Sequence, residues 1–229
     1  MTEWVCVLDC GVNYSIIYDI LLLEDFIQKL PDLKENETFY CCLFARKKYF
    51  PILKSDKSQL KRFTSNKEKL VDKIRQLECE VGSYKQDDIL IPQEALALYI
   101  SPNPRNNYKA TIKGIQRFAQ LIENQNQNFN PHQEILSVIQ QTAGTKKWVI
   151  FDIDTKEISK PEIENILGTS EFLFLETRGG FHVLVEPNKI PKSHSKTWHQ
   201  NLSKISDVRG DCLIPVPGCC QGGFIPRFV

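Results

Sequence analysis

The chain has 229 residues, of which 41% are hydrophobic and 25% are charged, and its formal net charge is +1. A chain of this length can bury a sizeable core, and it contains no run of about 18 apolar residues that would suit a membrane span. The N-terminus carries Glu3 and Asp9 and lacks a basic segment, so we expect neither a signal peptide nor a membrane partner.

The eight cysteines include two adjacent pairs and no CxxC motif. Without a signal peptide, this pattern favours free thiols in a reducing compartment such as the cytoplasm. A zinc site needs about four ligands at workable spacing, and we do not expect one. The combination that comes nearest is Cys212, Cys219 and Cys220 with His194 or His199.

Charge is distributed unevenly along the chain. Residues 46–78 hold eleven Lys/Arg residues against four acids, whereas residues 1–36 hold seven acids and two lysines. Tyr49, Phe50 and Phe63 lie inside the basic segment. Such a segment suits a nucleic-acid groove, because phosphate neutralisation supplies most non-specific affinity. A solvated, charged helix face is the alternative.

The N-terminal half is predicted to mix strands and helices. In chain order we expect a strand at 3–9, a helix at 14–29, a strand at 38–44, one or two basic helices within 54–78, a strand at 95–101, a helix at 106–124, an Asn/Gln-rich linker at 124–130 and a helix at 131–141.

The C-terminal part is predicted to alternate in the order β-α-β-β-α-β, the split βαβ arrangement. Its expected elements are strands at 146–154, 171–177, 181–187 and 205–216, and helices at 161–168 and 193–204. This arrangement has the strand order 4-1-3-2, so the first strand lies between the third and the fourth and runs antiparallel to both.

That order brings polar residues to one edge of one sheet. Asp152 and Asp154 end the first strand, His182 begins the third, and Asp207 begins the fourth. Side chains two residues apart on a strand share a face, so Asp152 and Asp154 can act together. Mg²⁺ and Mn²⁺ prefer carboxylates and substrate phosphates, and a pair of such ions can activate a 3′-hydroxyl and stabilise pyrophosphate.

A third carboxylate would complete the metal site. Asp207 is the first choice and Asp211 is the alternative. His182 and Arg178 suit triphosphate oxygens. Simpler explanations stay open, because strand ends often carry acids that only face water and Gly179-Gly180 can serve as a tight turn.

These motifs resemble those of the archaeo-eukaryotic primase superfamily. WVIFDID (148–154), GFH (180–182) and ISD (205–207) correspond, in order and spacing, to its DhD, small-x-His and hydrophobic-Asp motifs. The segment 207–224 resembles the strand-plus-PG segment of plasmid and phage primase-polymerases. FARKKYFP (44–51) and YISPNPRNNYKA (99–110) resemble its N-terminal module more loosely.

The resemblance implies that Asp152, Asp154 and Asp207 are the metal ligands and that His182 binds the triphosphate. Gly180 stands where many members have a serine that donates to phosphate. Contacts to template or nucleotide are expected from the basic residues of the looser match, which are Arg46, Lys47, Lys48 and Arg105.

The implied fold is α+β, with an N-terminal α/β module (1–125) packed on an RRM-like module (146–229) and the active-site cleft between them. The implied activity is template-dependent nucleotidyl transfer from an NTP or dNTP with two Mg²⁺ or Mn²⁺ ions. Expected partners are single-stranded or primed DNA, or RNA, with a helicase or accessory replication domain. Two alternatives are an inactive nucleic-acid-binding module and, from VIFDIDT, a haloacid-dehalogenase-like phosphatase.

Overall fold

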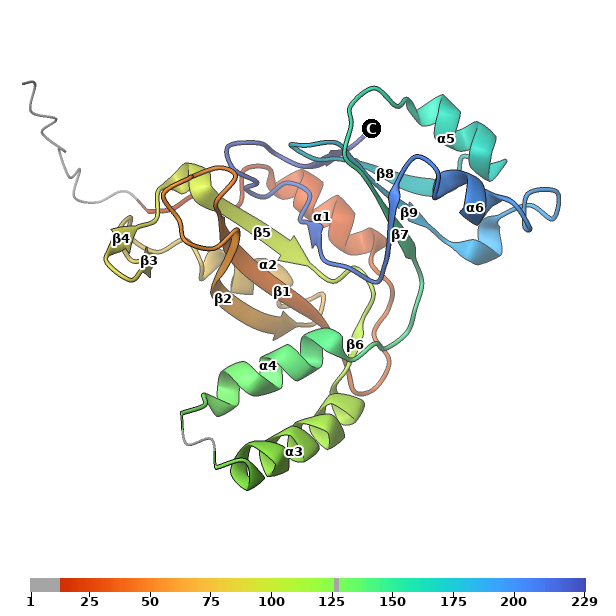
Figure 1. The fold of residues 1–229 in the computed structure, drawn as a ribbon. Coiled ribbons are helices and arrows are strands. Elements are labelled where there is room, and N and C mark those ends of the chain that lie inside the picture. The colour runs from red at the N-terminus through yellow and green to blue at the C-terminus, as the bar shows by residue number, and fades with distance from the viewer. Residues whose placement is uncertain (1–12, 126–127) are drawn as a thin grey trace, which may run out of the picture.

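The computed structural model of the protein describes residues 13–125 and 128–229, and it confirms a mixed α+β fold. Two sheets of five strands each lie side by side, with a helical hairpin projecting from the first of them (Figure 1). Each helix in the described part of the chain is too short or too polar to cross a bilayer. The strand expected at 3–9 lies outside the described residues.

The first sheet has the order β11 (Ile214–Pro215), β5 (Leu96–Ile100), β1 (Glu37–Arg46) and β2 (Lys57–Ser65), and β6 (Arg105–Asn106) also pairs with β1. Helices α1 (Ile20–Lys29) and α2 (Leu70–Arg75) cover one of its faces, through Phe26 and Ile74 among others. The side chain of Asp19 caps α1 by accepting from the backbone of Leu22, so the helix expected from residue 14 begins only at Ile20.

The prediction of helices within 54–78 is wrong for most of that range. Residues 57–65 form β2, which pairs with β1 from Phe39 opposite Ser65 to Arg46 opposite Lys57, and only Leu70–Arg75 is helical. Leu60 and Phe63 are three residues apart, which is the spacing of one helix face, whereas in a regular strand they would point to opposite faces. A bulge in the pairing with β1 skips Leu60, and both side chains pack against the core from β2. Pairing with β1 decides between helix and strand, because strand formation depends on tertiary context.

The second sheet has the order β10 (Asp207–Gly210), β7 (Val149–Ile153), β9 (Phe181–Val185), β8 (Phe172–Glu176) and β12 (Arg227–Phe228). Its first four strands have the expected order, with β7 antiparallel to both neighbours. Helices α5 (Lys160–Leu167) and α6 (Trp198–Leu202) pack on its outer face. A Ser159–Glu162 capping box starts α5 and a left-handed Gly168 ends it.

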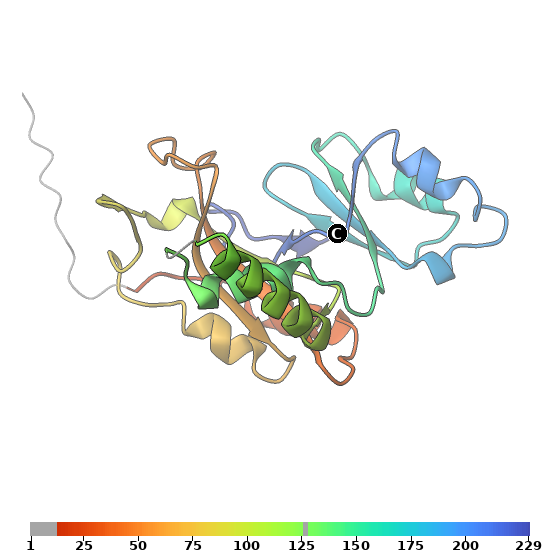
Figure 2. The same ribbon diagram turned by 60° about the horizontal axis from the view of Figure 1, so that its bottom comes forward.

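The remaining elements are the helices α3 (Asn107–Glu123) and α4 (Pro131–Gln141), the short strands β3 (Lys85–Gln86) and β4 (Ile89–Leu90), and the 3₁₀ turns Gln93–Ala95 and Pro187–Lys189. Turning the molecule brings the α3–α4 hairpin to the front, with α3 outermost (Figure 2). The helices expected at 106–124 and 131–141 are confirmed.

The strand expected at 205–216 is split between the two sheets. Residues 207–210 form β10 in the second sheet, whereas Ile214 and Pro215 pair with β5 in the first. Cys219 and Cys220 are then buried in the core under the first sheet. The chain therefore crosses the expected module boundary and returns to the second sheet only at β12.

One hydrophobic core joins the two sheets. Trp148, Ile150 and Leu184 of the second sheet belong to the same buried cluster as Phe26 of α1. The rings of Phe26 and Phe228 lie 6.1 Å apart. These contacts fix the inner face of the second sheet against the first sheet. They thereby set the direction in which the polar end of that inner face points.

Candidate active site

A row of polar residues crosses the inner face of the second sheet. Asp152 on β7 lies opposite Asp207 on β10 and opposite His182 on β9. Residues directly opposite on adjacent strands present their side chains on the same face. The sequence prediction that these residues share one edge of one sheet therefore agrees with the observed register.

Asp154 follows β7 two residues after Asp152, and both side chains line the same cleft. His182 is 8% exposed, and its Nε2 lies 3.6 Å from Oδ1 of Asp152. An imidazole at this distance from a carboxylate forms an ion pair when it is protonated. Negative charge thus gathers at the end of β7 with one titratable base beside it.

The cleft has a volume of about 820 Å³. Its walls come from both sheets, from the turn after β8 and from the end of α4. The lining residues are Phe44, Arg46, Lys48, Asp56, Gln59, Tyr99, Arg105, Gln140, Gln141, Asp152, Asp154, Thr177, Gly179, His182, Asp211, Cys212, Leu213 and Gln221.

Lys48 faces the carboxylates across this cleft. Desolvation and then the Arg46 guanidinium lower the pKa of Lys48, while the carboxylates of Asp56, Asp154 and Asp152, in that order, act in the opposite direction. Lys47 is exposed and is not among the residues that line the cleft. Lys48 is therefore the cation of this loop that is placed to meet a bound anion.

Arg46 forms part of the cleft wall and is largely buried. It donates to the hydroxyl of Tyr99 at 2.6 Å and to the carbonyl oxygen of Asp56 at 3.2 Å. These bonds hold the guanidinium beside the ring of Tyr99, at 5.7 Å from its centroid. Arg46 thus orients the aromatic wall of the cleft as well as adding positive charge to it.

Arg105 and Asp211 form a buried ion pair at the side of the cleft. Nη1 of Arg105 lies 2.6 Å from Oδ2 of Asp211, and the Arg105 side chain is only 4% exposed. Asn103 also donates to the Asp211 carboxylate, at 3.2 Å, and accepts from the backbone of Trp148 at 2.9 Å. This network ties the end of β10 to the first module and the start of β7.

The turn between β8 and β9 is held by the C-terminal segment. The Arg178 backbone donates to Gln221 at 2.8 Å, and its guanidinium donates to the carbonyl of Gly222 and stacks 4.3 Å from the ring centroid of Tyr49.

A Cβ at Gly180 would lie 1.9 Å from the carbonyl oxygen of Ile153. Glycine is therefore required at position 180 for close packing against the end of β7, and a serine has no room there.

The described residues contain no group of three or more His, Cys, Asp or Glu side chains placed to hold a metal ion. The cysteines and histidines considered from the sequence, which are Cys212, Cys219 and Cys220 with His194 or His199, do not form such a group either. The chemistry of the carboxylates still fits Mg²⁺ or Mn²⁺, because such ions use one or two protein carboxylates and complete their coordination with phosphates and water. Asp152 and Asp154 supply that pair on one side of the cleft.

No family model, curated protein or solved structure matches this chain. The geometry of the site must therefore carry the assignment. Each strand pairing that the structure describes between its named strands is antiparallel, including both pairings of β7. The doubly wound parallel sheet expected for a haloacid-dehalogenase-like phosphatase is therefore not the architecture around Asp152.

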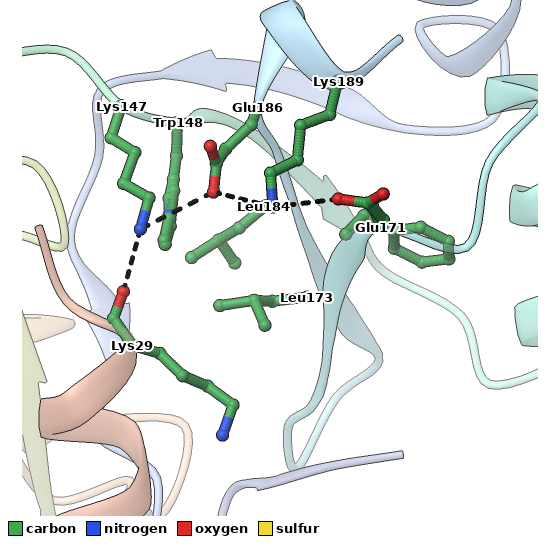
Figure 3. Close-up of a pocket in the computed structure, with 9 residues that line it drawn as sticks. Lys29, Lys147, Trp148, Glu171, Leu173, Leu184, Glu186 and Lys189 are labelled. Carbon is green, nitrogen blue, oxygen red and sulfur yellow. Dashed lines mark hydrogen bonds and ion pairs between the residues drawn. The ribbon is translucent and has the colours of Figure 1, made fainter. Parts of the chain in front are cut away.

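A smaller cavity of about 260 Å³ lies at the other end of the same sheet face, between α1 and the second sheet (Figure 3). Its charged side chains form ion pairs, Lys29 with Asp25 of its own helix and the other two lysines with glutamates of the cavity. Lys147 lies 3.5 Å from Glu186 and donates to the last carbonyl of α1 at 3.2 Å, while Lys189 lies 3.1 Å from Glu171. This cavity is lined by a compensated ion-pair cluster around Trp148.

Some cleft residues carried no sequence signal. Gln140 and Gln141, at the end of α4, belong to no motif of the sequence. Phe44 and Tyr99 do lie in the two segments that resemble the N-terminal module, and they form an edge-to-face pair at 5.4 Å on one wall. The pairing of β1 with β5 brings these two segments together.

Proposed function

We propose that the protein is a metal-dependent nucleotidyltransferase that adds a nucleoside monophosphate to a 3′-hydroxyl on a nucleic-acid template, as the resemblance to archaeo-eukaryotic primases implies. The observation that carries the proposal is the row of Asp207, Asp152 and His182 on adjacent strands. Asp152 and His182 line a cleft between two modules, large enough for a substrate and faced by Lys48.

In the proposed reaction the 3′-oxygen bonds the α-phosphorus of an NTP or dNTP, the bond to the β-phosphate oxygen breaks, pyrophosphate leaves and the hydroxyl proton passes to solvent. Bound divalent ions would supply the charge that activates the 3′-hydroxyl and neutralises pyrophosphate. Asp152, Asp154 and Asp207 would hold those ions. His182 and Lys48 would bind phosphate oxygens by charge-assisted hydrogen bonds.

The structure favours Asp207 over Asp211 as the third carboxylate. Asp207 lies opposite Asp152 in the sheet, whereas the Asp211 carboxylate is already bound by Arg105 and Asn103. A carboxylate in a buried ion pair would have to give up that pairing to bind a metal. Asp211 and Arg105 are therefore assigned to holding the site together.

The architecture also supports the proposal. The strand order β10-β7-β9-β8, with α5 and α6 on the outer face, is consistent with an RRM-like module, and the first module supplies the opposite wall of the cleft. Beside that wall, the β1–β2 connection carries exposed cations at Lys47 and at Lys54, and Lys54 also pairs with Asp87 at 2.7 Å. We assign this surface to template phosphates, from single-stranded or primed DNA or from RNA. Work at a replication site beside a helicase would suit such an activity.

The test is template-dependent extension of a primed single strand with Mg²⁺ or Mn²⁺, beside an unprimed reaction. Wild type should extend the primer and Asp152→Asn should not. Asp88→Asn, the same change at an exposed carboxylate on the β3–β4 turn, should behave as wild type. Extension retained by Asp152→Asn would refute the assignment.

A nucleic-acid-binding module without catalysis is the second candidate, because the exposed lysines of the β1–β2 connection suit template phosphates with or without catalysis. The same variants distinguish the two functions. A binding module would bind single-stranded DNA equally well as wild type and as Asp152→Asn, with no product from either.

A further inference from the structure

Helix α3 is apolar on two opposite sides, and only one of them is covered. The covered side carries Ala110, Gly114 and Leu121, which are buried where α3 packs on α4. Arg117 joins the same side through an ion pair with Glu134 of α4, at 3.0 Å. This contact is all that the α3–α4 hairpin needs for its own packing.

The uncovered side carries an exposed apolar stripe, here called the α3 stripe, formed by Tyr108, Ile112, Ile115, Ala119 and Ile122. The exposed fractions of its four large residues are 65%, 44%, 65% and 69% in chain order. Large apolar side chains gathered on one exposed face mark an interaction surface. α3 is the outermost element of the hairpin, so the described part of the chain leaves this face accessible (Figures 1 and 2).

The spacing of the α3 stripe is that of a helix–helix seam. Successive members are separated by four, three, four and three residues. Apolar residues in this alternation form one straight line along a helix and pack against a second helix by interdigitation. A helix of 17 residues offers a seam of about 25 Å.

The charges beside the stripe indicate which helix fits. Lys109 and Glu123 each follow a stripe residue by one position, so both lie on the same side of the stripe at its opposite ends, and both are exposed. An antiparallel copy of α3 would place Lys109 beside Glu123 of the second copy, twice by symmetry. A parallel copy would place that side against the uncharged Thr111 and Phe118.

We infer that the α3 stripe is a self-association surface, through which two copies of the protein pair by antiparallel packing of their α3 helices. Antiparallel helices also oppose their macrodipoles favourably. A standard interface buries roughly 800 Å² per partner, and a seam of this length buries less. The dimer should therefore be weak, with a dissociation constant of roughly 10 µM or higher. This inference does not depend on the proposed catalytic function.

The test is sedimentation velocity of the full chain from about 5 to about 500 µM. Wild type should shift from monomer towards dimer across this range. Ile115→Asp should remain monomeric. Lys109→Glu should weaken the dimer roughly tenfold, because two symmetric pairs become like-charge contacts, and adding Glu123→Lys should restore wild-type association.

Ile52→Asp is the matched control, because Ile52 is also exposed (66%) but lies on the loop before β2. It should associate like wild type, and circular dichroism should show all variants folded. A wild type that stays monomeric to the highest concentration would overturn the inference. So would association unchanged by Ile115→Asp, or a charge-swapped double variant no better than Lys109→Glu.

Discussion

The two ends of the inner face of the second sheet carry charge in opposite ways. At one end, lysines and glutamates around Trp148 form mixed ion pairs, such as Lys147 with Glu186 and Lys189 with Glu171. At the other end, two carboxylates, Asp152 and Asp207, lie directly opposite each other on adjacent strands. Both ends border the same core, since Ile150 and Leu184 lie between them.

The comparison distinguishes charged residues that stabilise the fold from charged residues that we propose bind a ligand. Opposite charges across a sheet or at a helix end support the fold, whereas like charges placed opposite each other destabilise it. Two carboxylates that face each other beside a cleft suit a cationic ligand, and a cation with phosphate is the ligand that the carboxylates, Lys48 and His182 would share.

The largest effect should distinguish Asp207 from Asp211. Asp207→Asn should lower the rate of nucleotidyl transfer by about a thousandfold, because a metal's charge stabilisation is worth several kcal/mol. Asp211→Ala should keep transfer within a few-fold of wild type in the folded protein. Single-turnover rates of the two variants measure the contrast, and the reverse result would make Asp211 the ligand.

The same Asp211→Ala change should instead lower the free energy of unfolding by about 3 kcal/mol, because the Arg105 side chain is left charged and buried. Urea denaturation measures this. Arg117→Ala, which removes the exposed pair with Glu134, is the control and should change stability by less than about 1 kcal/mol. Equal losses in the two variants would contradict the structural role of the Arg105–Asp211 pair.

Gly180→Ser should destabilise the protein by about 2 kcal/mol, since its Cβ would meet the Ile153 carbonyl and push the end of β7 away. Transfer activity should fall with it, although a serine is common at this position in the family that the chain resembles. Gly179→Ser is the matched control, because a Cβ there meets nothing within 4 Å. Thermal melts and extension assays measure the stability and the activity of both variants. A Gly180→Ser protein as stable as wild type would contradict the close contact between position 180 and the Ile153 carbonyl.

At the far end of the sheet, Lys147→Met should lower stability by about 1 kcal/mol through loss of its bonds to Glu186 and to the end of α1. Transfer activity should be unchanged. Denaturant titration and the extension assay together check this. Loss of activity without loss of stability would mean that the two ends of the sheet are coupled.

The smallest expected effect is a gain. Asp154→Asn removes a carboxylate two residues from Asp152, so stability in metal-free buffer should rise by a few tenths of a kcal/mol while transfer is lost. Calorimetry with chelator measures the stability. A destabilised Asp154→Asn protein would indicate that the carboxylate supports the fold rather than a ligand.

The sequence predicts best where signals are local. Hydrophobic runs predict the strands of the second sheet, and Pro161 in the first turn and Gly168 just past the end predict its first helix. The general strand order of the split βαβ arrangement then predicts that Asp152, His182 and Asp207 lie together, as the observed register has them.

Features that depend on distant partners could not be predicted in this way. β2 was expected to be helical because Leu60 and Phe63 have the spacing of a helix face, and the bulge that lets both pack from a strand arises only in the pairing with β1. The crossing of Ile214–Pro215 to β5 and the pairing of Arg105 with Asp211 each join segments about a hundred residues apart. No local pattern encodes such contacts.

The most direct test of the central claim is Mn²⁺ binding at the cleft, measured by electron paramagnetic resonance with and without a nucleoside triphosphate. This readout does not require a complete catalytic cycle. Wild type should bind Mn²⁺ more tightly when the triphosphate is present, Asp152→Asn should bind it at least about tenfold more weakly, and Asp88→Asn should match wild type. Equal Mn²⁺ affinity in wild type and Asp152→Asn would contradict the claim that this row of carboxylates is a metal–triphosphate site.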